Sequence, residues 1–239
     1  MPISQAAAAH YEETYSHHVA FGVEWRKIGA RGKAANISSI CQPFPHRSLL
    51  EIGCGDGAII RELESFAENV AGLEISHAAV NQCVQAGLNV ALFDGSRIPY
   101  ADKSVDVAIL SHVVEHLENP REVLYEAARI ARHVFVEVPL EDNRGLKMDF
   151  VPNEIGHINF YSMKTIRQLL QTCGLEIKAQ KLSHSSLAGY RYRLGPKAYA
   201  AWAIKSAALM FPRLATKMWT YNCSLLAGSS RTSSNFGAV

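Results

Sequence analysis

The stretch LLEIGCGDGAII, residues 49–60, places three glycines within five residues between two apolar runs. This pattern predicts a strand, a tight glycine loop and the start of a helix. Gly53 and Gly55 would let the backbone turn sharply and approach a ligand without a Cβ atom in the way. In an open α/β sheet such a loop lies at the carboxyl ends of the strands, where ligands bind. A simpler alternative is a strand–turn–helix junction that needs glycine only for its turn.

The rest of the chain repeats this alternation of short apolar runs and helical patterns. Most of the runs are continuously apolar, which is typical of strands buried on both faces of a parallel sheet. Ser76 and Ser162 can cap helices, and Asn119 precedes a first-turn proline. The alternation predicts an α/β fold with a doubly wound sheet. The expected strands are 48–52, 70–74, 90–93, 105–110, 134–138, 175–182 and 221–227, and the expected helices are 56–67, 76–87, 121–132 and 163–173.

Some segments lie outside the alternation of strands and helices, and they indicate how the chain is divided into a cap, a main domain, an insertion and a tail. Residues 1–46 are predicted to form an N-terminal helical cap, and residues 47–228 the ligand-binding domain. Residues 188–219 read as a helical insertion within that domain, and residues 229–239 as a polar tail. Residues 139–161 form a long connection, and insertions of this kind are often lids or functional loops.

The composition is that of an ordinary globular protein, with 239 residues of which 48% are hydrophobic and 19% charged. The length suits one domain with a full core. The first ten residues do not resemble a signal peptide, and no run of about 18 apolar residues occurs. Five cysteines without paired spacing favour reduced thiols over disulfides or a zinc site. We therefore expect a cytoplasmic protein with no metal site.

Two acids follow the glycine loop at regular intervals. Glu74 closes the second expected strand, 21 residues after Gly53, where a carboxylate can accept both hydroxyls of a ribose. Asp94 closes the third expected strand 20 residues later, where it can meet an adenine amino group, and Gly95 leaves room beside it. The pair predicts that the ligand contains an adenosine.

The charges beside the glycine loop favour S-adenosylmethionine over a dinucleotide as the adenosine ligand. A dinucleotide brings a pyrophosphate, which requires a helix N-terminus free of negative charge. Glu51 and Asp56 flank that N-terminus here, and the glycines are spaced G-x-G-x-G rather than G-x-G-x-x-G. S-adenosylmethionine carries a sulfonium and an ammonium group instead of phosphate, so the acids suit it. An NAD(P)-linked oxidoreductase on a similar sheet and a non-catalytic adenosine-binding module are the alternatives.

The chain resembles the class I S-adenosylmethionine-dependent methyltransferases, in particular the small-molecule branch that includes the ubiquinone-biosynthesis type. The resemblance rests on LLEIGCGDG, VAGLEIS, LFDGSRIPYADKSVDVAILSHVVEHLENP and GHINFYSMKTIRQLLQTCGLEI, and covers roughly residues 48–182. It implies a Rossmann-like sheet of seven strands, mostly parallel, with an antiparallel last strand, and S-adenosylmethionine as cofactor. Residues 188–219 depart from the family, which often has only a hairpin there. The implied cofactor contacts are Glu51, Gly53, Cys54, Gly55, Glu74, Ile75, Asp94, Gly95 and the segment around Ser111 and His112.

Methyl transfer from a sulfonium is an in-line displacement, so alignment in a dry site can provide much of the catalysis. A base is needed only where the acceptor must lose a proton. His112 and His116 follow the fourth strand and are candidates for base or substrate contact, although a scaffold role is favoured for His116. His157, on the connection after the fifth strand, is the preferred base. The expected acceptor atom is an oxygen or nitrogen of a small molecule.

Tyr11 and Tyr15, four residues apart on a predicted helix, would share one face and could close over the cofactor or pack in the core. Residues 177–239 contain nine basic residues and no acid, which suggests an anionic partner for this end of the chain. Arg191 and Arg193 are therefore candidate contacts to an anionic acceptor. The motif of base-methylating enzymes is missing after the fourth strand, so we expect no nucleic-acid partner.

The segment 196–219 has three interpretations. Its apolar stripe of Tyr199, Trp202, Ala203, Leu209 and Met210 could be buried against the core, with Lys205 on the solvated side. It could instead cover a pocket for an anionic acceptor, or make a peripheral contact with an anionic membrane. The first interpretation leaves the missing acids unexplained, and we expect the acceptor pocket rather than the membrane.

Overall fold

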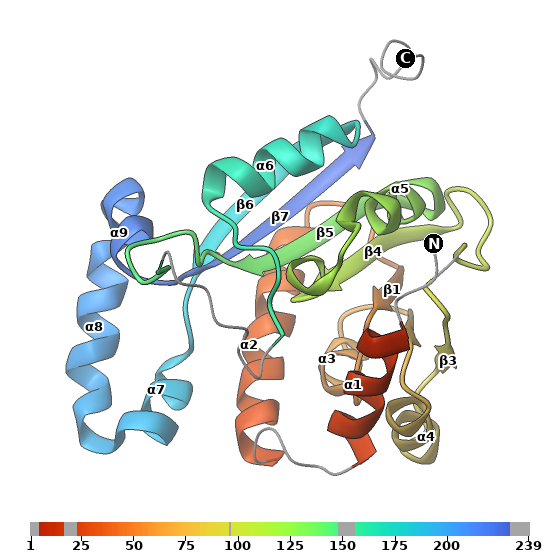
Figure 1. Ribbon diagram of the computed structural model, residues 1–239, viewed down its shortest axis with the longest axis horizontal. Coiled ribbons are helices and arrows are strands. Elements are labelled where there is room, and N and C mark those ends of the chain that lie inside the picture. The colour runs from red at the N-terminus through yellow and green to blue at the C-terminus, as the bar shows by residue number, and fades with distance from the viewer. Residues whose placement is uncertain (1–4, 17–22, 96, 148–155, 230–239) are drawn as a thin grey trace.

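The computed structural model describes residues 5–16, 23–95, 97–147 and 156–229. Its centre is one seven-stranded sheet in the order β3-β2-β1-β4-β5-β7-β6 (Figure 1). Strands β1 to β5 pair in parallel, whereas β7 lies antiparallel between β5 and β6. The predicted α/β sheet with an antiparallel last strand is therefore confirmed. The strands are β1 (Ser48–Ile52), β2 (Asn69–Glu74), β3 (Val90–Leu92), β4 (Val105–Ser111), β5 (Ala131–Pro139), β6 (Leu175–Ser183) and β7 (Asn222–Ser229).

Helices cover both faces of the sheet (Figure 1). Helices α5 and α6 lie on one face, and α2 and α3 lie on the other. The helices are α1 (Gln5–Ser16), α2 (Val23–Cys41), α3 (Ala58–Leu63), α4 (His77–Gln85), α5 (Pro120–Ile130), α6 (Met163–Thr172), α7 (Leu187–Leu194), α8 (Ala198–Ala208) and α9 (Pro212–Met218), with short 3₁₀ turns η1 (Val114–His116) and η2 (Gly195–Lys197). No helix in the described ranges is long and apolar enough to cross a membrane.

The two cores follow from the two-residue period of the strands. Successive side chains of a strand point to opposite faces, so neighbouring residues of β1 serve different cores. Leu50 packs with Leu124 of α5 in one core, and Leu49 packs with Ile37 of α2 in the other. Continuous apolar runs such as VAIL, residues 107–110 of β4, are therefore required by the fold, because both faces of these strands are covered.

The ends of several elements differ from the sequence prediction. Helix α5 ends at Ile130 and β5 begins at Ala131, whereas a helix to residue 132 was expected. The reason is the sheet register, because Ala131 already pairs with Val105 of β4. Helix α3 covers only Ala58–Leu63 of the expected 56–67, because Gly57 before it adopts a left-handed backbone.

The predicted N-terminal cap divides into two parts. Helix α2 belongs to the sheet's own helical layer, since Ile37 and Ile40 lie in the core. Helix α1 packs against α4, with Glu12 accepting hydrogen bonds from the Ser76 hydroxyl and the Ala78 N–H. Only α1 is therefore placed as a cap. The insertion 188–219 is helical as predicted, and residues 230–239 of the expected tail lie outside the described residues.

Leu50 offers a direct test of the core assignment. It is fully buried, so Leu50→Ala should lower the free energy of unfolding by about 2–5 kcal/mol through lost contacts and a cavity. Val84→Ala, at a residue 58% exposed, should change it by less than about 0.5 kcal/mol. Urea denaturation measures both. Equal losses in the two variants would contradict the assignment of Leu50 to the core.

Candidate functional site

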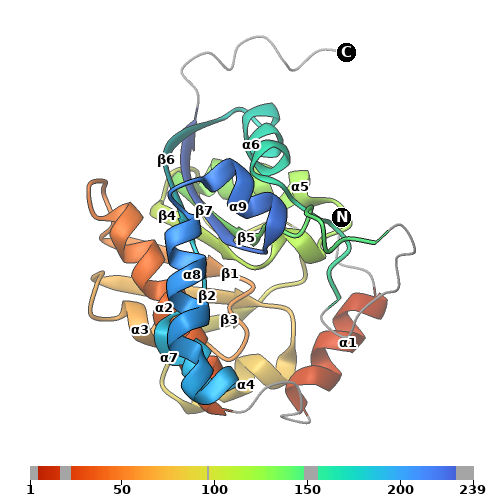
Figure 2. The same ribbon diagram turned by 90° about the vertical axis from the view of Figure 1, so that its left-hand side faces the viewer.

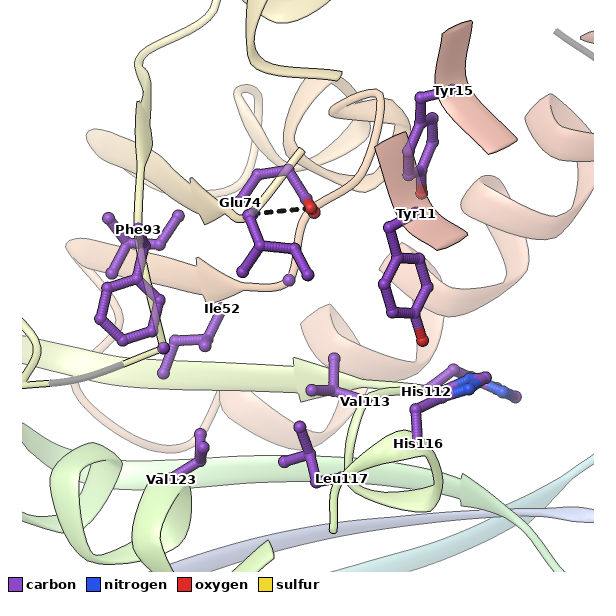
Figure 3. Close-up of a pocket in the computed structure, with 14 residues that line it drawn as sticks. Tyr11, Tyr15, Ile52, Glu74, Phe93, His112, Val113, His116, Leu117 and Val123 are labelled. Atoms are coloured by element: carbon purple, nitrogen blue, oxygen red, sulfur yellow. Dashed lines mark hydrogen bonds between the residues drawn. The ribbon is translucent and has the colours of Figure 1, made fainter. Parts of the chain in front are cut away.

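Two cavities open at the carboxyl ends of β1, β2 and β4. The smaller, of about 210 Å³, lies between α1 and the strand ends, and its walls include Ile52, Glu74 and Phe93 (Figure 3). The larger, of about 640 Å³, lies beside α2 and α7. Both are lined by Tyr15, Gly53 and His112, so the cavities meet at the glycine loop.

The glycine loop requires its glycines for close approach as well as for turning. Gly53 and Gly55 have φ angles of 75° and 54°, which residues with a Cβ atom rarely adopt. A Cβ atom at Gly53 would lie 3.0 Å from a methyl group of Val113, and one at Gly55 would collide with the Tyr15 hydroxyl. A bare backbone therefore forms the boundary between the two cavities.

Glu74 connects this loop to β2. Its buried carboxylate accepts hydrogen bonds from the backbone N–H groups of Gly55 and Ile75, each at 2.7 Å, and from Ser76 at 3.0 Å. Each carboxylate oxygen has more than one lone pair, so Glu74 can still accept from a ligand. It faces the smaller cavity, as Figure 3 shows. This is the position that a ribose-binding acid requires.

Glu51 is a buried carboxylate with unused hydrogen-bonding capacity. It is 1% exposed, lines the larger cavity, and its Oε2 has no hydrogen-bond partner among the described residues. Burial raises the pKa of Glu51 to about 8, against the opposing charge of Lys33. A cationic ligand group would supply the missing partner. The residues present thus fit the ammonium of S-adenosylmethionine.

Asp56 differs from the sequence expectation. Its carboxylate lies 3.1 Å from the guanidinium of Arg26 on α2, so its charge is already balanced within the protein. The negative charge left for a ligand beside the glycine loop is therefore that of Glu51. Arg26 gave no sequence signal, because its partner lies thirty residues away in the chain.

The remaining expected cofactor contacts separate into two groups. Cys54 and Ser111 line the larger cavity, and Ile75 and Gly95 line the smaller. Asp94 is exposed and lines neither cavity, although Phe93 and Gly95 on either side of it line the smaller one. A hydrogen bond with Cys83 and burial both raise the pKa of Cys54, which suits a packed thiol rather than a nucleophile.

His112 occupies an unusual position at the end of β4. It has a φ angle of 58°, which is rare for a residue other than glycine and is often found at functional sites. Its Nδ1 lies 3.2 Å from Glu115 and its Nε2 3.5 Å from Glu137. Burial and Lys33 oppose protonation, but the two carboxylates outweigh them and raise the pKa of His112. The ring is therefore predisposed to be an imidazolium.

His116 has the opposite character. It lines the smaller cavity, and its Nδ1 lies 3.2 Å from the carbonyl oxygen of Gly156. A carbonyl can only accept, so Nδ1 carries the proton and Nε2 keeps its lone pair in the neutral ring. Burial lowers the pKa of His116 despite the nearby Glu115. Neutral His116 can therefore act as a base.

The structure does not bring His157, the preferred base from sequence, to the wall of either cavity. It is buried behind His116, with the two ring centroids 4.7 Å apart. Its Nδ1 lies 2.6 Å from a carboxylate oxygen of Glu141. This position suits a residue that supports His116, and the role of His157 as the base stays a prediction without support from its position.

Tyr11 and Tyr15 line the smaller cavity from α1, and their role as a cover over the cofactor stays a prediction (Figure 3). The Tyr11 ring meets His116 edge to face, with centroids 6.1 Å apart. Burial, with a contribution from Glu115, raises the pKa of Tyr11 to about 12, so its hydroxyl stays protonated at neutral pH.

Potential metal ligands also meet here. Ligand atoms of Glu115, His116 and His157 lie within 4.8 Å of one another, a set that could hold a divalent cation. The sequence analysis expected no metal site. Glu115 and His116 are adjacent in the sequence, but His157 joins them only through the fold.

Arg191 and Arg193, the expected acceptor contacts, are exposed on α7 and line neither cavity. The guanidinium of Arg193 lies 5.7 Å from the ring centroid of Trp25, and Tyr192 stacks on the same indole. Trp25 itself lines the larger cavity. The two arginines therefore remain predictions as acceptor contacts, without support from their position.

Several residues of the larger cavity were missed from sequence. Lys33 and Asn36 lie on α2, and Asn36 donates a hydrogen bond to Glu137. Glu137 offered a signal, because an acid inside the apolar run VFVEVP must have partners once the strand is buried. Lys33 and Asn36 offered none, because α2 has no clear apolar face in the sequence.

The fold and the site define a class I S-adenosylmethionine-dependent methyltransferase domain. Residues 24–180 match a family model described as a methyltransferase domain. The chain belongs to this family. The match begins inside α2 and ends in β6, so it includes the glycine loop, Glu74 and all three candidate histidines.

Individual relatives agree with this assignment. A probable S-adenosylmethionine-dependent methyltransferase from Mycolicibacterium smegmatis is 28% identical over 139 residues, 55% of this chain and 53% of that protein. The chain thus spans about half the length of this curated relative. A solved geranyl diphosphate methyltransferase in complex with S-adenosylmethionine has a TM-score of 0.59 at 14% identity, covering 83% of this chain and 85% of that chain. A [4+2]-cyclase has a TM-score of 0.60 at 18% identity, covering 84% and 81%. These two structures support the fold alone.

The raised pKa of Glu51 gives a test of cofactor binding. At pH 7 Glu51 is mostly protonated, and binding a cation should ionise it, so the wild type should release up to about one proton per S-adenosylmethionine bound. Calorimetry in two buffers of different ionisation enthalpy measures this release. Glu51→Gln should bind more weakly and release almost none. Equal proton release by both proteins would exclude Glu51 as the residue that meets the cofactor's cation.

Proposed function

We propose that the protein transfers a methyl group from S-adenosylmethionine to an oxygen or nitrogen of a small, anionic acceptor. The observation that carries this proposal is the meeting of two cavities at Tyr15, Gly53 and His112. One cavity has the acid and apolar walls that suit an adenosine. The other is larger and polar, and it offers space for an acceptor beside the same loop.

The chain's own residues would hold the cofactor in three ways. Glu74, whose Oε2 can accept one more hydrogen bond, would accept from a ribose hydroxyl. Glu51 would face the ammonium group, and the bare backbone at Gly53 would leave room between them. Tyr11 and Tyr15 would exclude water from above. When bound, S-adenosylmethionine supplies an electrophilic methyl group on a sulfonium.

We propose His116 as the base. Because His116 lines the smaller cavity and not the larger one, the reacting group of the acceptor would have to pass the junction at Gly53 and His112 to reach it. The Nε2 of His116 would take the proton from an acceptor hydroxyl or ammonium, and the Gly156 carbonyl would hold Nδ1–H throughout. Glu115 would stabilise the imidazolium that forms, whereas His157, which lies behind the ring and beside Glu141, would fix its position. His112 has its charge balanced by two carboxylates, so we assign it a positioning role at the junction of the cavities.

Lys33 supports an anionic acceptor. The described residues that line the larger cavity include one lysine, Lys33, and one arginine, Arg26. The guanidinium of Arg26 is already paired with the carboxylate of Asp56. Lys33 is therefore the cation available to an acceptor anion, in place of Arg191 and Arg193. The diphosphate acceptor named for the geranyl diphosphate methyltransferase is an anion with an apolar part, which agrees with this class of acceptor.

The family match argues against the NAD(P)-linked alternative. The non-catalytic alternative still needs a direct test, because the [4+2]-cyclase shows that the fold also serves other reactions. We propose a cytoplasmic location, since all five cysteines are unpaired and buried.

Turnover is the test of the proposed function. The protein and S-adenosylmethionine should be incubated with metabolite extracts fractionated by charge, and mass spectrometry should find an anionic compound that gains one methyl group. S-adenosylhomocysteine should accumulate in step with it. Lys33→Met should raise KM for that acceptor by about tenfold or more with a smaller effect on the cofactor. Cofactor binding without turnover in any fraction would favour the non-catalytic module.

The pH profile identifies the base. Because burial lowers the pKa of His116, the rising acid limb of kcat should lie below pH 6.5, and kcat should level off at higher pH. His116→Gln should lower kcat by about 10²–10⁴-fold and abolish this limb. His157→Gln is the matched comparison and should shift the limb with a smaller loss. A larger loss in His157→Gln than in His116→Gln would restore the ranking made from sequence.

A further inference from the structure

The insertion after β6 presents an apolar surface to solvent. Helices α8 and α9 lie on the outside of the molecule, facing the viewer in Figure 2. Met210 and Phe211, at the turn between them, are 78% and 69% exposed. We define the helical patch as Tyr199, Ile204, Met210, Phe211, Leu214 and Met218, all of which are exposed.

Helix α8 is apolar on both sides, and the stripe expected to be buried against the core is divided: Tyr199, Ala203 and Met210 are exposed, whereas Trp202 and Leu209 are half-buried. Tyr199, Ala203 and Ile204 are exposed, whereas Lys205 lies on the inner side with its Nζ 4.8 Å from the ring centroid of Tyr221. Burial lowers the pKa of Lys205. A surface helix in water normally has the reverse arrangement. The outer face of α8 is therefore suited to an apolar environment.

This orientation is held by specific contacts. The Tyr221 hydroxyl donates to the carbonyl oxygen of Lys205 at 2.8 Å, and Nε2 of His184 lies 3.0 Å from the Ser206 hydroxyl. The His184 ring also lies against Trp202, with centroids 6.2 Å apart. The inner side of α8 is therefore attached to the sheet edge, and the helical patch cannot turn inward without breaking these bonds.

Cations surround the helical patch. Lys197, Arg213 and Lys217 are exposed on α9 and on the turns beside α8, and Arg191 is exposed on α7. None of them lines either cavity at the strand ends, and residues 177–239 contain no acid; the acid nearest in the chain to a contact with α9 is the exposed Asp142, two residues before Arg144, whose N–H donates to the Lys217 carbonyl. An apolar surface with an excess of cations around it is the combination that binds anionic lipid headgroups and the acyl boundary together.

We propose that the helical patch docks this protein on an anionic membrane surface. The apolar side chains enter the boundary between headgroups and acyl chains. The long side chains of the four cations extend to the headgroups and contact lipid phosphates. Helix α7 links the surface to the site, because its Gly189 and the preceding Ser186 line the larger cavity. Docking does not require the proposed methyl transfer.

Other partners fit less well. In a two-fold contact between copies of this chain the patch would face itself, and the cations would repel one another with no acid between them. A nucleic acid would neutralise the cations but would leave Ile204, Met210 and Leu214 without apolar contact. Vesicle cosedimentation and sedimentation velocity distinguish self-association and nucleic-acid binding from membrane docking.

Cosedimentation with vesicles tests the proposal. The wild type should bind vesicles of phosphatidylcholine and phosphatidylglycerol in equal parts at least about tenfold more tightly than vesicles of phosphatidylcholine alone, and salt should weaken binding. Phe211→Ser with Leu214→Ser, and separately Lys197→Glu with Arg213→Glu, should each weaken it about tenfold or more. The matched controls Val84→Ser and Lys164→Glu, at exposed positions on α4 and α6, should bind as the wild type does.

Three results would overturn the proposal. The first is no binding of the wild type to either vesicle. The second is an unchanged affinity in both patch variants. The third is a loss of self-association in those variants, measured by sedimentation velocity, without a change in vesicle binding. As a check that needs no variant, brominated phosphatidylglycerol should quench wild-type tryptophan fluorescence, because Trp219 is exposed beside the patch. Cofactor affinity should be the same in all variants, which separates this test from that of the proposed function.

Discussion

The carboxylate of Glu74 is the group on which the geometry of the site depends. It accepts backbone hydrogen bonds from the glycine loop at Gly55 and from the turn into α4 at Ile75 and Ser76. A buried carboxylate without these donors would be strongly destabilised, so the loop and the turn are held at one separation. Glu12 of α1 caps the same turn, which places the two tyrosines of α1 over the cavity. The smaller cavity is thus built into the fold itself.

Neighbouring histidines acquire opposite protonation states from their surroundings. His112 lies between two buried carboxylates, and these raise its pKa. His116, one turn of chain later, faces a carbonyl and an apolar cavity, and burial lowers its pKa. Pairs of titratable groups whose pKa values are driven apart in this way are typical of sites that separate a charged role from a basic one. The structure therefore shifts the pKa values of His112 and His116 in opposite directions, although the two residues look alike in the sequence.

Much of the fold could be predicted because it depends on local patterns. Apolar runs, glycine spacing and caps located the strands, the loop and the acid at the end of β2, and β1 has the expected bounds. What could not be predicted depends on contacts between distant segments. Arg26 pairs with Asp56, His157 packs behind His116, and Lys205 turns inward under α8. For that helix the periodicity grouped Trp202 with Tyr199, whereas Trp202 lies inward against His184 and Tyr199 is exposed; the attachment of α8 to Tyr221 and His184 decides which residues meet solvent.

The central claim is that the glycine loop and Glu74 form a site for S-adenosylmethionine. Calorimetric titration of the wild type and of Glu74→Gln with S-adenosylmethionine and with NAD⁺ tests it most directly. The account predicts saturable binding of S-adenosylmethionine to one site, weakened about 10- to 100-fold in the variant because a charge-assisted acceptor is lost, and no comparable binding of NAD⁺. An unchanged affinity in a folded Glu74→Gln variant, or tighter binding of NAD⁺ than of S-adenosylmethionine, would contradict it.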